Sequence, residues 1–179
     1  MGVSVIQNRS AEFKEALLHR ILVADGAMGT ALYGKGIFLN RCYDELNLSL
    51  PALIRDIHQE YVRAGAEIIE TNTYGANRKR LAGFGFAEKL GQINQAGVRI
   101  AREVARDQAF VAGAMGPLGV RLEPLGPVSF AEARELFREQ AAALAEAGAD
   151  LIILETFRDL TNCVRRCWRC ARQRGVKCL

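Results

Sequence analysis

The feature that most constrains the fold of this chain is a pattern of twelve residues that occurs twice. "RAGAEIIETNTY" (63–74) aligns without a gap with "EAGADLIILETF" (146–157). Each copy leaves a helical segment at Ala-Gly-Ala, passes an acidic residue, enters an apolar run and ends with a polar residue, Thr and an aromatic residue. A repeated order of helix, glycine turn and strand is typical of alternating α/β units.

The remaining segments continue this alternation. Apolar runs predict strands at 21–25, 67–73, 110–115 and 150–157, the first of them buried, and helical spacing predicts helices from Pro51 up to Gly65, at 87–105 and at 130–147. Ser129 and Glu132 form a capping box before the last helix. His19 and His58 lie in helical segments and are expected to be at the surface or half-buried. Strands that alternate with helices predict crossover connections and a parallel sheet.

Composition narrows the class of protein. Half of the 179 residues are hydrophobic, and no apolar run is long enough to span a bilayer. The first residues lack the basic and apolar regions of a signal peptide, so a cytoplasmic domain with no membrane partner is expected. The net charge of +4 arises mainly from the basic C-terminal segment, so no nucleic-acid partner is expected either.

Polar residues stand at the ends of several predicted strands. Asp25 follows the run 21–24, Asn72 and Glu155 hold equivalent positions in the repeat, and Glu70 lies on the same strand face as Asn72. Ligands of parallel α/β folds bind at the carboxyl ends of strands, so these four side chains are expected to line one concavity. A buried carboxylate needs a partner, which favours a cationic or hydrogen-bonding ligand. There are alternatives to ligand binding. Asp25 could be a turn residue, and the glutamates could pair with core arginines.

Four segments carry a resemblance to a known family. "LVADGAMGT", "IIETNTYGANRKRL", "AGAMGPLG" and "GADLIILETF" are similar to the homocysteine S-methyltransferase domain of cobalamin-dependent methionine synthase, betaine–homocysteine methyltransferase and methylenetetrahydrofolate reductase fusions. The resemblance covers about residues 13–160. It implies a (β/α)8 barrel of the TIM type, of which residues 1–179 would form a single partial domain, the N-terminal half with about four β/α units.

The resemblance also implies a reaction and its site. Family members transfer a methyl group to the sulfur of homocysteine and give methionine, with methyltetrahydrofolate through cobalamin, betaine or S-methylmethionine as the methyl donor. Asp25 and Glu155 match the acids that hold the amino group of homocysteine. The other substrate-binding residues that the resemblance implies are two on the second strand and three in the glycine turn: Glu70, Asn72, Gly26, Met28 and Gly29.

The family holds the substrate sulfur on a zinc ion bound by three cysteines that follow later strands. No residue of this chain matches one of those ligands, so the resemblance implies that neither zinc nor a catalytic residue is present here, and that the chain is inactive alone. A non-catalytic amino-acid-binding half-barrel that dimerises or docks on a partner is the alternative. Open sheet edges also predict self-association, with Val23, Ile68 and Ile153 on an exposed apolar face.

Residues 161–179 form an atypical tail rich in Arg and Cys, which departs from the family pattern. An out-of-frame reading and a partial sequence are both compatible with such an end. Cys163, Cys167 and Cys170 have the spacing of one helical face, which favours a buried stripe. The Cys167-x-x-Cys170 spacing also fits a zinc site that Cys163 and Cys178 would complete, so a small metal or nucleic-acid element is a third hypothesis.

Overall fold

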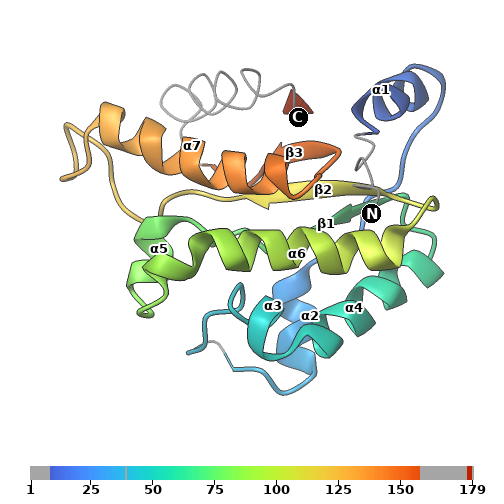
Figure 1. The fold of residues 1–179 in the computed structure, drawn as a ribbon, viewed down its shortest axis with the longest axis horizontal. Helices are drawn as coiled ribbons and strands as arrows, with labels where there is room; N and C mark the ends of the chain where they lie inside the picture. Colours follow the sequence, from blue (N-terminus) through green and yellow to red (C-terminus); the bar gives the residue numbers. More distant parts are fainter. Residues whose placement is uncertain (1–8, 39, 158–176, 179) are drawn as a thin grey trace, which may run out of the picture.

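The computed structural model describes residues 9–38, 40–157 and 177–178, and it is an α/β fold (Figure 1). The helices are α1 (Ser10–His19), α2 (Met28–Gly34), α3 (Leu46–Ser49), α4 (Pro51–Arg63), α5 (Arg78–Ala82), η1 (Ala87–Lys89), α6 (Leu90–Ala105) and α7 (Phe130–Glu146). The strands are β1 (Ile68–Glu70), β2 (Phe110–Met115), β3 (Leu151–Leu154) and β4 (Lys177–Cys178).

The strands form one open parallel sheet in the order β1-β2-β3-β4. The predicted crossover topology is therefore confirmed. The predicted strand 21–25 is reduced to a parallel bridge between Ala24 and Ile68, which places this segment beside β1 at the sheet edge. The prediction that it is buried is wrong, because Ile21 and Val23 are 89% and 56% exposed. No described strand pairs with the outer side of this segment.

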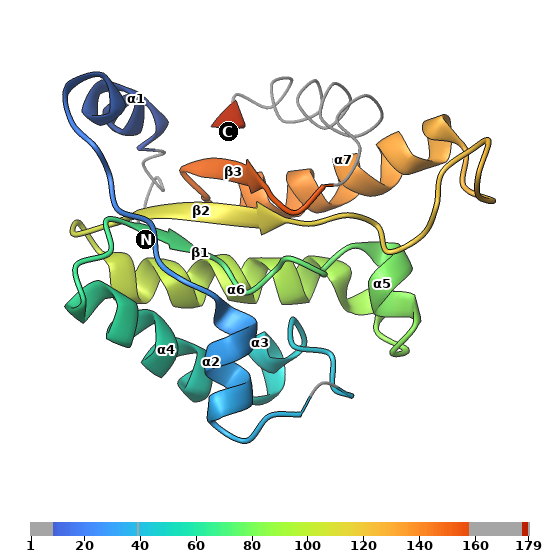
Figure 2. The ribbon, with the colours of Figure 1, turned by 180° about the vertical axis from the view of Figure 1, so that it is seen from behind.

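Helices α6 and α7 cover one face of the sheet, and α4 packs against α6 (Figures 1 and 2). Alternate strand residues, among them Ile69, Val111 and Ile152, join the apolar faces of these helices in the largest core cluster. All six residues of β2 are buried, as expected for a strand with neighbours on both sides and packing on both faces.

Helix α1 covers part of the opposite face, near the starts of the strands (Figure 2). The ring of Phe13 packs edge-to-face on Phe110 with 5.2 Å between centroids, beside Ile68 and Leu151. Ile68 and Ile153 belong to this face as predicted, but the prediction that the face is exposed is wrong at Ile68, which is buried in the cluster with Phe13. Val23 does not belong to this face: its neighbour Leu22 packs there, because successive residues of an extended chain point to opposite sides.

A buried carboxylate ties α1 to the sheet. Asp150, fully buried, accepts hydrogen bonds from the backbone N–H groups of Val111 (2.8 Å) and Arg9 (3.1 Å). It also forms an ion pair with Arg102 of α6 at 2.7 Å. A buried charge is tolerated when it is paired and hydrogen-bonded in this way. One residue therefore links α1, α6, β2 and the start of β3.

The sequence repeat is also a repeat of backbone structure. Gly65 after α4 and Gly148 after α7 adopt positive φ values of 101° and 91°, which the missing side chain of glycine permits. After each glycine, the next N–H donates five residues back: Ala66 to Tyr61 at 3.0 Å, and Ala149 to Leu144 at 3.2 Å. This is the Schellman ending of a helix, and it starts β1 and β3 in equivalent ways.

The predicted capping box forms in part. The Ser129 side chain accepts a hydrogen bond from the backbone N–H of Glu132 at 3.1 Å, which caps α7. The Glu132 carboxylate instead forms an ion pair with Lys79 at 2.9 Å. The cap thus marks the start of α7 correctly.

His58 of α4 is fully buried, which contradicts its predicted position at or near the surface. Neither ring nitrogen has a hydrogen-bond partner among the described residues. Burial lowers the pKa of His58 to about 4, from an ordinary value of 6.5. The folded chain therefore binds fewer protons at this site than the unfolded chain between those values, so this residue removes stability as pH falls from 6.5 to 4.

Replacing His58 by leucine is expected to raise the free energy of unfolding, because it removes an unpartnered polar group from the core. The gain is expected to be larger at pH 5 than at pH 7.5 by about 2 kcal/mol, the cost of keeping the buried ring neutral. Urea titrations of both proteins at the two pH values test this. An equal gain at both values would show that the ring does not titrate in a buried environment.

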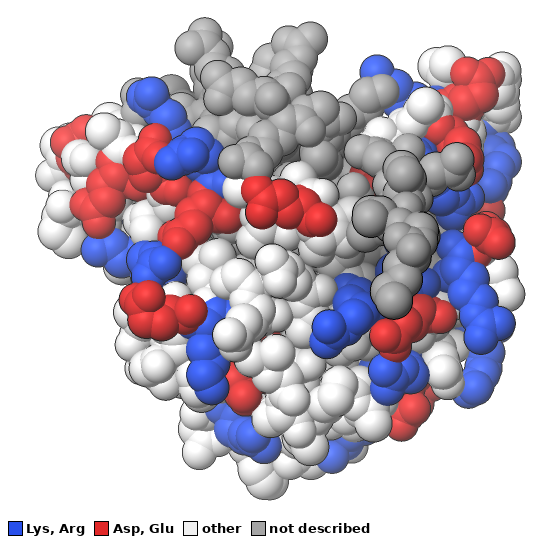
Figure 3. All heavy atoms as spheres, viewed as in Figure 1, with Lys and Arg blue, Asp and Glu red and all other residues white. Residues whose placement is uncertain are grey.

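Charges of both signs are interspersed on the face shown in Figure 3. Near α7, Arg78 pairs with Glu139 and Glu88, and Arg138 pairs with Glu135.

None of the described helices combines the length and apolar character needed to cross a bilayer. The predictions for Cys163, Cys167 and Cys170 lie outside the described residues.

Candidate functional site

Three carboxyl groups meet at the carboxyl end of the sheet. Glu70 is the last residue of β1, and Glu155 directly follows β3. The backbone N–H of Glu70 donates to both carboxylate oxygens of Asp25, at 3.2 and 3.1 Å. The carboxyl groups of Glu70 and Glu155 lie close enough that each shifts the pKa of the other. The strand-end acids that were expected to converge are therefore neighbours, and we refer to these three residues as the acid end of the site.

Burial, together with the closeness of the carboxyl groups, raises the pKa values at the acid end. Burial, followed by the charge of Glu70, raises the pKa of Asp25 to about 7. Burial and the charge of Glu155 raise the pKa of Glu70 to about 7, and burial also raises the pKa of Glu155. No described Lys, Arg or His forms an ion pair with any of the three. A cationic ligand would supply the missing counter-charge.

Asn72 is buried, and its amide is engaged with the loop before α3. It donates to the backbone oxygen of Tyr43 at 2.7 Å and to the Asn47 side chain at 3.1 Å. The Asn47 amide donates in return to the Asn72 backbone oxygen at 2.8 Å. Asn72 lines the cleft described below, but these bonds also give it a structural function, since they fix the Tyr43 loop.

The glycine turn follows Asp25 and begins α2. A side chain at Gly26 would lie 3.0 Å from the ring of Tyr61, so only glycine fits without displacing that ring. The Tyr61 hydroxyl donates to the backbone oxygen of Ala27 at 3.3 Å, on the same side of the turn. Met28 and Gly29 line the cleft, whereas Gly26 lies behind it against Tyr61.

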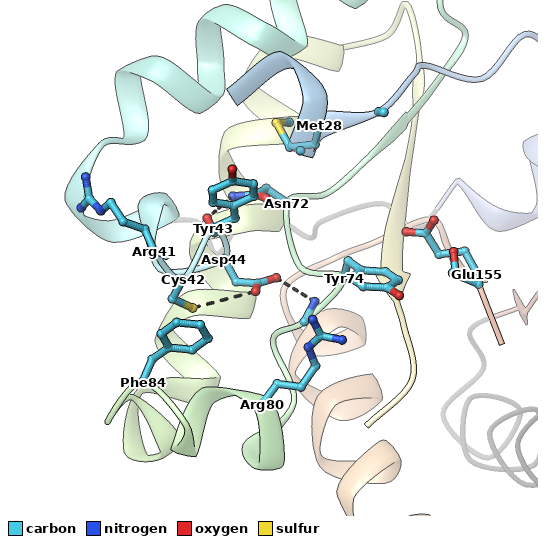
Figure 4. Close-up of a pocket in the computed structure, with 14 residues that line it drawn as sticks. Met28, Arg41, Cys42, Tyr43, Asp44, Asn72, Tyr74, Arg80, Phe84 and Glu155 are labelled. Atoms are coloured by element: carbon cyan, nitrogen blue, oxygen red, sulfur yellow. Dashed lines mark hydrogen bonds between the residues drawn. The ribbon is translucent and has the colours of Figure 1, made fainter. Parts of the chain in front are cut away.

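A cleft of about 470 Å³ opens beside the acid end (Figure 4). Its lining comes from the glycine turn, the loop before α3, the segment after β1, the α5 region and the end of β3: Ala27, Met28, Gly29, Arg41, Cys42, Tyr43, Asp44, Asn72, Tyr74, Gly75, Arg80, Phe84, Glu155 and Thr156. Of the predicted site residues, Met28, Gly29, Asn72 and Glu155 line it directly. Asp25, Gly26 and Glu70 are not among its lining residues.

Ten of these fourteen lining residues are not among the predicted site residues. Cys42, Tyr43 and Asp44 lie in a loop with no periodic pattern, and Arg80 lies in a basic segment, 77–81, whose charges are typical of a solvated helix start. Tyr74 ends the first copy of the repeat, two residues after Asn72, and this position was the one available signal.

The backbone is strained at the edge of the cleft. Thr156, directly after Glu155, has a φ of 62°, in the left-handed region that a β-branched residue rarely adopts. Such strain costs on the order of 1–3 kcal/mol and tends to collect at functional sites. It accompanies the turn that carries the chain away from Glu155.

The described residues do not form a three-ligand metal site. Cys42, which lines the cleft, is buried, and its thiol lies 3.9 Å from a carboxylate oxygen of Asp44. Burial and the charge of Asp44 raise the pKa of this thiol, which disfavours the thiolate that binds zinc. One thiol and one carboxylate do not fit a tetrahedral zinc site.

Comparison with known proteins identifies relatives over most of the chain. A family model described as Homocysteine S-methyltransferase matches residues 22–173. Methionine synthases of Mycobacterium leprae (strain TN) and Mycobacterium tuberculosis (strain ATCC 25618 / H37Rv) are each 36% identical over 158 residues. These alignments cover 82% of this chain but only 13% of either methionine synthase.

Solved structures confirm the fold class. The metallated form of the homocysteine methyltransferase MmuM from Escherichia coli superposes with a TM-score of 0.81 at 26% identity, over 93% of this chain and 64% of MmuM. Its apo form gives a TM-score of 0.70 at 26% identity, over 90% and 59%. This chain thus matches a part of that structure, as predicted for a partial barrel.

Proposed function

This chain belongs to the homocysteine S-methyltransferase family, and we propose on this premise that it binds homocysteine at the acid end of the cleft. The observation that carries the proposal is the convergence of Asp25, Glu70 and Glu155 with no basic partner among the described residues. The α-ammonium group of an amino acid matches this need in charge and size. Glu155, which lines the cleft, would contact that group first.

The other predicted site residues would add charge or shape the cleft. The Asp25 carboxylate accepts a hydrogen bond from the backbone N–H of Glu70. In this position it adds negative charge beside Glu155. The turn that contains Met28 and Gly29 provides a narrow wall for the aliphatic part of the substrate. Asn72 holds the Tyr43 loop, so it shapes the cleft as well as lining it.

Methyl transfer to the homocysteine sulfur is the finer part of the proposal. In this reaction the sulfur–methyl bond forms as the bond between the methyl group and the donor breaks. The electron pair of the broken bond remains on the donor, and the thiol proton leaves to solvent. The described residues bind and orient the amino acid, and no step is assigned to a metal, because the described residues do not fit one.

Calorimetric titration of the chain with L-homocysteine tests the proposal. Binding is expected, and 4-sulfanylbutanoate, which lacks the amino group, is expected to bind far more weakly. Affinity for homocysteine should rise from pH 6 to pH 8, because Asp25 and Glu70 have pKa values of about 7 and attract an ammonium group only when ionised.

Equal binding of homocysteine and 4-sulfanylbutanoate would contradict the assignment of the acid end to the amino group. A methyl-transfer assay on the same preparation separates a catalyst from the alternative, an amino-acid-binding module: methionine formation supports the first, and homocysteine binding without turnover supports the second.

A further inference from the structure

The cleft has a second end, which is basic and aromatic. Arg80, Tyr74 and Phe84 line it on the side away from Glu155, and Arg41 lies at its rim. In Figure 4 the ring of Tyr74 lies between Glu155 and the guanidinium of Arg80. The two ends of the cleft therefore carry opposite charge and are separated by an aromatic ring.

Arg80 is held in place beside Asp44, whose charge attracts it, but the two side chains do not form a close ion pair. Its guanidinium lies over the Tyr74 ring, 5.3 Å from the centroid. Its backbone N–H is held at 3.0 Å by the Asn77 side chain, which caps α5. None of the described residues accepts a hydrogen bond from its guanidinium or forms an ion pair with it. A stacked arginine whose guanidinium N–H groups make no hydrogen bond to the described residues keeps those donors for an anion.

The two preceding residues of α5 behave differently. Arg78 forms ion pairs with Glu139 at 2.5 Å and Glu88 at 2.9 Å, and Lys79 forms one with Glu132 at 2.9 Å. All these partners lie outside the cleft lining. Of these three consecutive basic residues, Arg80 lines the cleft and is the one for which no close ion pair is found among the described residues.

Asp44 is the acid beside Arg80; the charge of Arg80 favours its ionised form, but its hydrogen bonds go to other groups. Its carboxylate accepts a hydrogen bond from the Gly75 N–H at 2.8 Å and the weak contact of the Cys42 thiol. A side chain at Gly75 would lie 2.7 Å from an Asp44 oxygen and 3.1 Å from Nε of Arg80, so only glycine lets both groups pack this close to the backbone here. Arg80 is thus oriented beside a carboxylate but remains available to a ligand.

We propose that Arg80 binds the carboxylate of the methyl donor, with Arg41 adding positive charge at the rim. This inference rests on the proposed function, in which homocysteine occupies the acid end. The ammonium and carboxylate groups of an amino acid sit on one carbon, so a homocysteine held at Glu155 keeps its own carboxylate on that side of Tyr74. The arginine end then takes the second substrate, a small methyl donor that carries a carboxylate.

The test uses S-methylmethionine and glycine betaine, each paired with its methyl ester, which lacks the negative charge. Each compound is titrated calorimetrically into the chain with and without saturating homocysteine. For Arg80→Gln, affinity for the carboxylate form of the true donor is expected to fall about 10- to 100-fold, the loss of charge-assisted hydrogen bonds. Affinity for its ester should be unchanged, and Arg80→Lys should recover part of the loss. The compound that shows this pattern identifies the donor class.

Lys79→Gln is the matched control, because it removes the same charge from the neighbouring position outside the cleft, and it should bind both donors like the parent chain. Failure of both carboxylate donors to bind, or an equal effect of Arg80→Gln on acid and ester, would overturn the inference. So would a loss of homocysteine affinity in Arg80→Gln with no change for the donors. Absence of homocysteine binding to the unmodified chain contradicts the proposed function instead, and the titrations without homocysteine still report on Arg80.

Discussion

Glu155→Gln is expected to bind L-homocysteine about 30- to 150-fold more weakly than the unmodified chain, a loss of roughly 2–3 kcal/mol for removing one partner of a partly buried charge pair. The amide keeps the shape of the side chain and removes its charge, so the proposed ammonium group loses the carboxylate that lines the cleft. Calorimetric titration at pH 8 measures the change.

The same substitution should not destabilise the fold. Glu155 raises the pKa of Glu70 and of Asp25 by its charge, so its removal relieves repulsion within the acid end. Weaker binding with equal or higher resistance to urea would therefore locate the effect in recognition. Glu135→Gln, which removes an exposed acid of α7, serves as the control. Unchanged affinity in Glu155→Gln would contradict the assignment of the amino group to this residue.

Asp150→Ala is expected to lower the free energy of unfolding by about 3–5 kcal/mol, the usual cost of breaking a buried, hydrogen-bonded ion pair. The substitution leaves Arg102 without its carboxylate and removes the acceptor for the N–H groups of Val111 and Arg9. Chemical denaturation followed by circular dichroism measures the change.

Asp150→Asn keeps the shape and an acceptor oxygen, so it should cost less, about 1–3 kcal/mol, and it gives a second measurement if the alanine variant does not fold. Glu135→Gln again provides the comparison, because exposed ion pairs such as Glu135–Arg138 contribute at most about 1 kcal/mol. A loss below this level in Asp150→Ala would show that α1 and α6 do not depend on the buried carboxylate.

The sequence predicted those elements whose pattern is set by their own residues. The strand at 110–115 matches β2 to the residue, because it is apolar throughout and has neighbours on both sides. The strand predicted at 67–73 ends at Glu70, since Thr73 folds back and donates its N–H to the backbone oxygen of Thr71 at 2.8 Å. Apolar composition could not reveal that 21–25 lies at an exposed edge, because exposure there depends on neighbouring strands and not on the segment itself.

The site was predictable on one side only. The acids stand at strand ends, where parallel topology brings distant residues together, and the repeat marks those positions. Arg80 gave no such signal, because in the sequence its charge is indistinguishable from those of Arg78 and Lys79. In the structure, Arg78 and Lys79 form ion pairs with Glu139, Glu88 and Glu132, whereas the described residues form no ion pair with Arg80.

The order of the strands in the sheet implies an order of assembly. Each strand from β1 to β3 pairs with the one before it in the sequence, so every β/α unit can dock on finished structure as it leaves the ribosome. Helix α1 is the exception, because Arg9 bonds to Asp150, which is synthesised 141 residues later. Helix α1 therefore gains its contact with Asp150 only after β3 begins to be synthesised, and that part of its docking comes late.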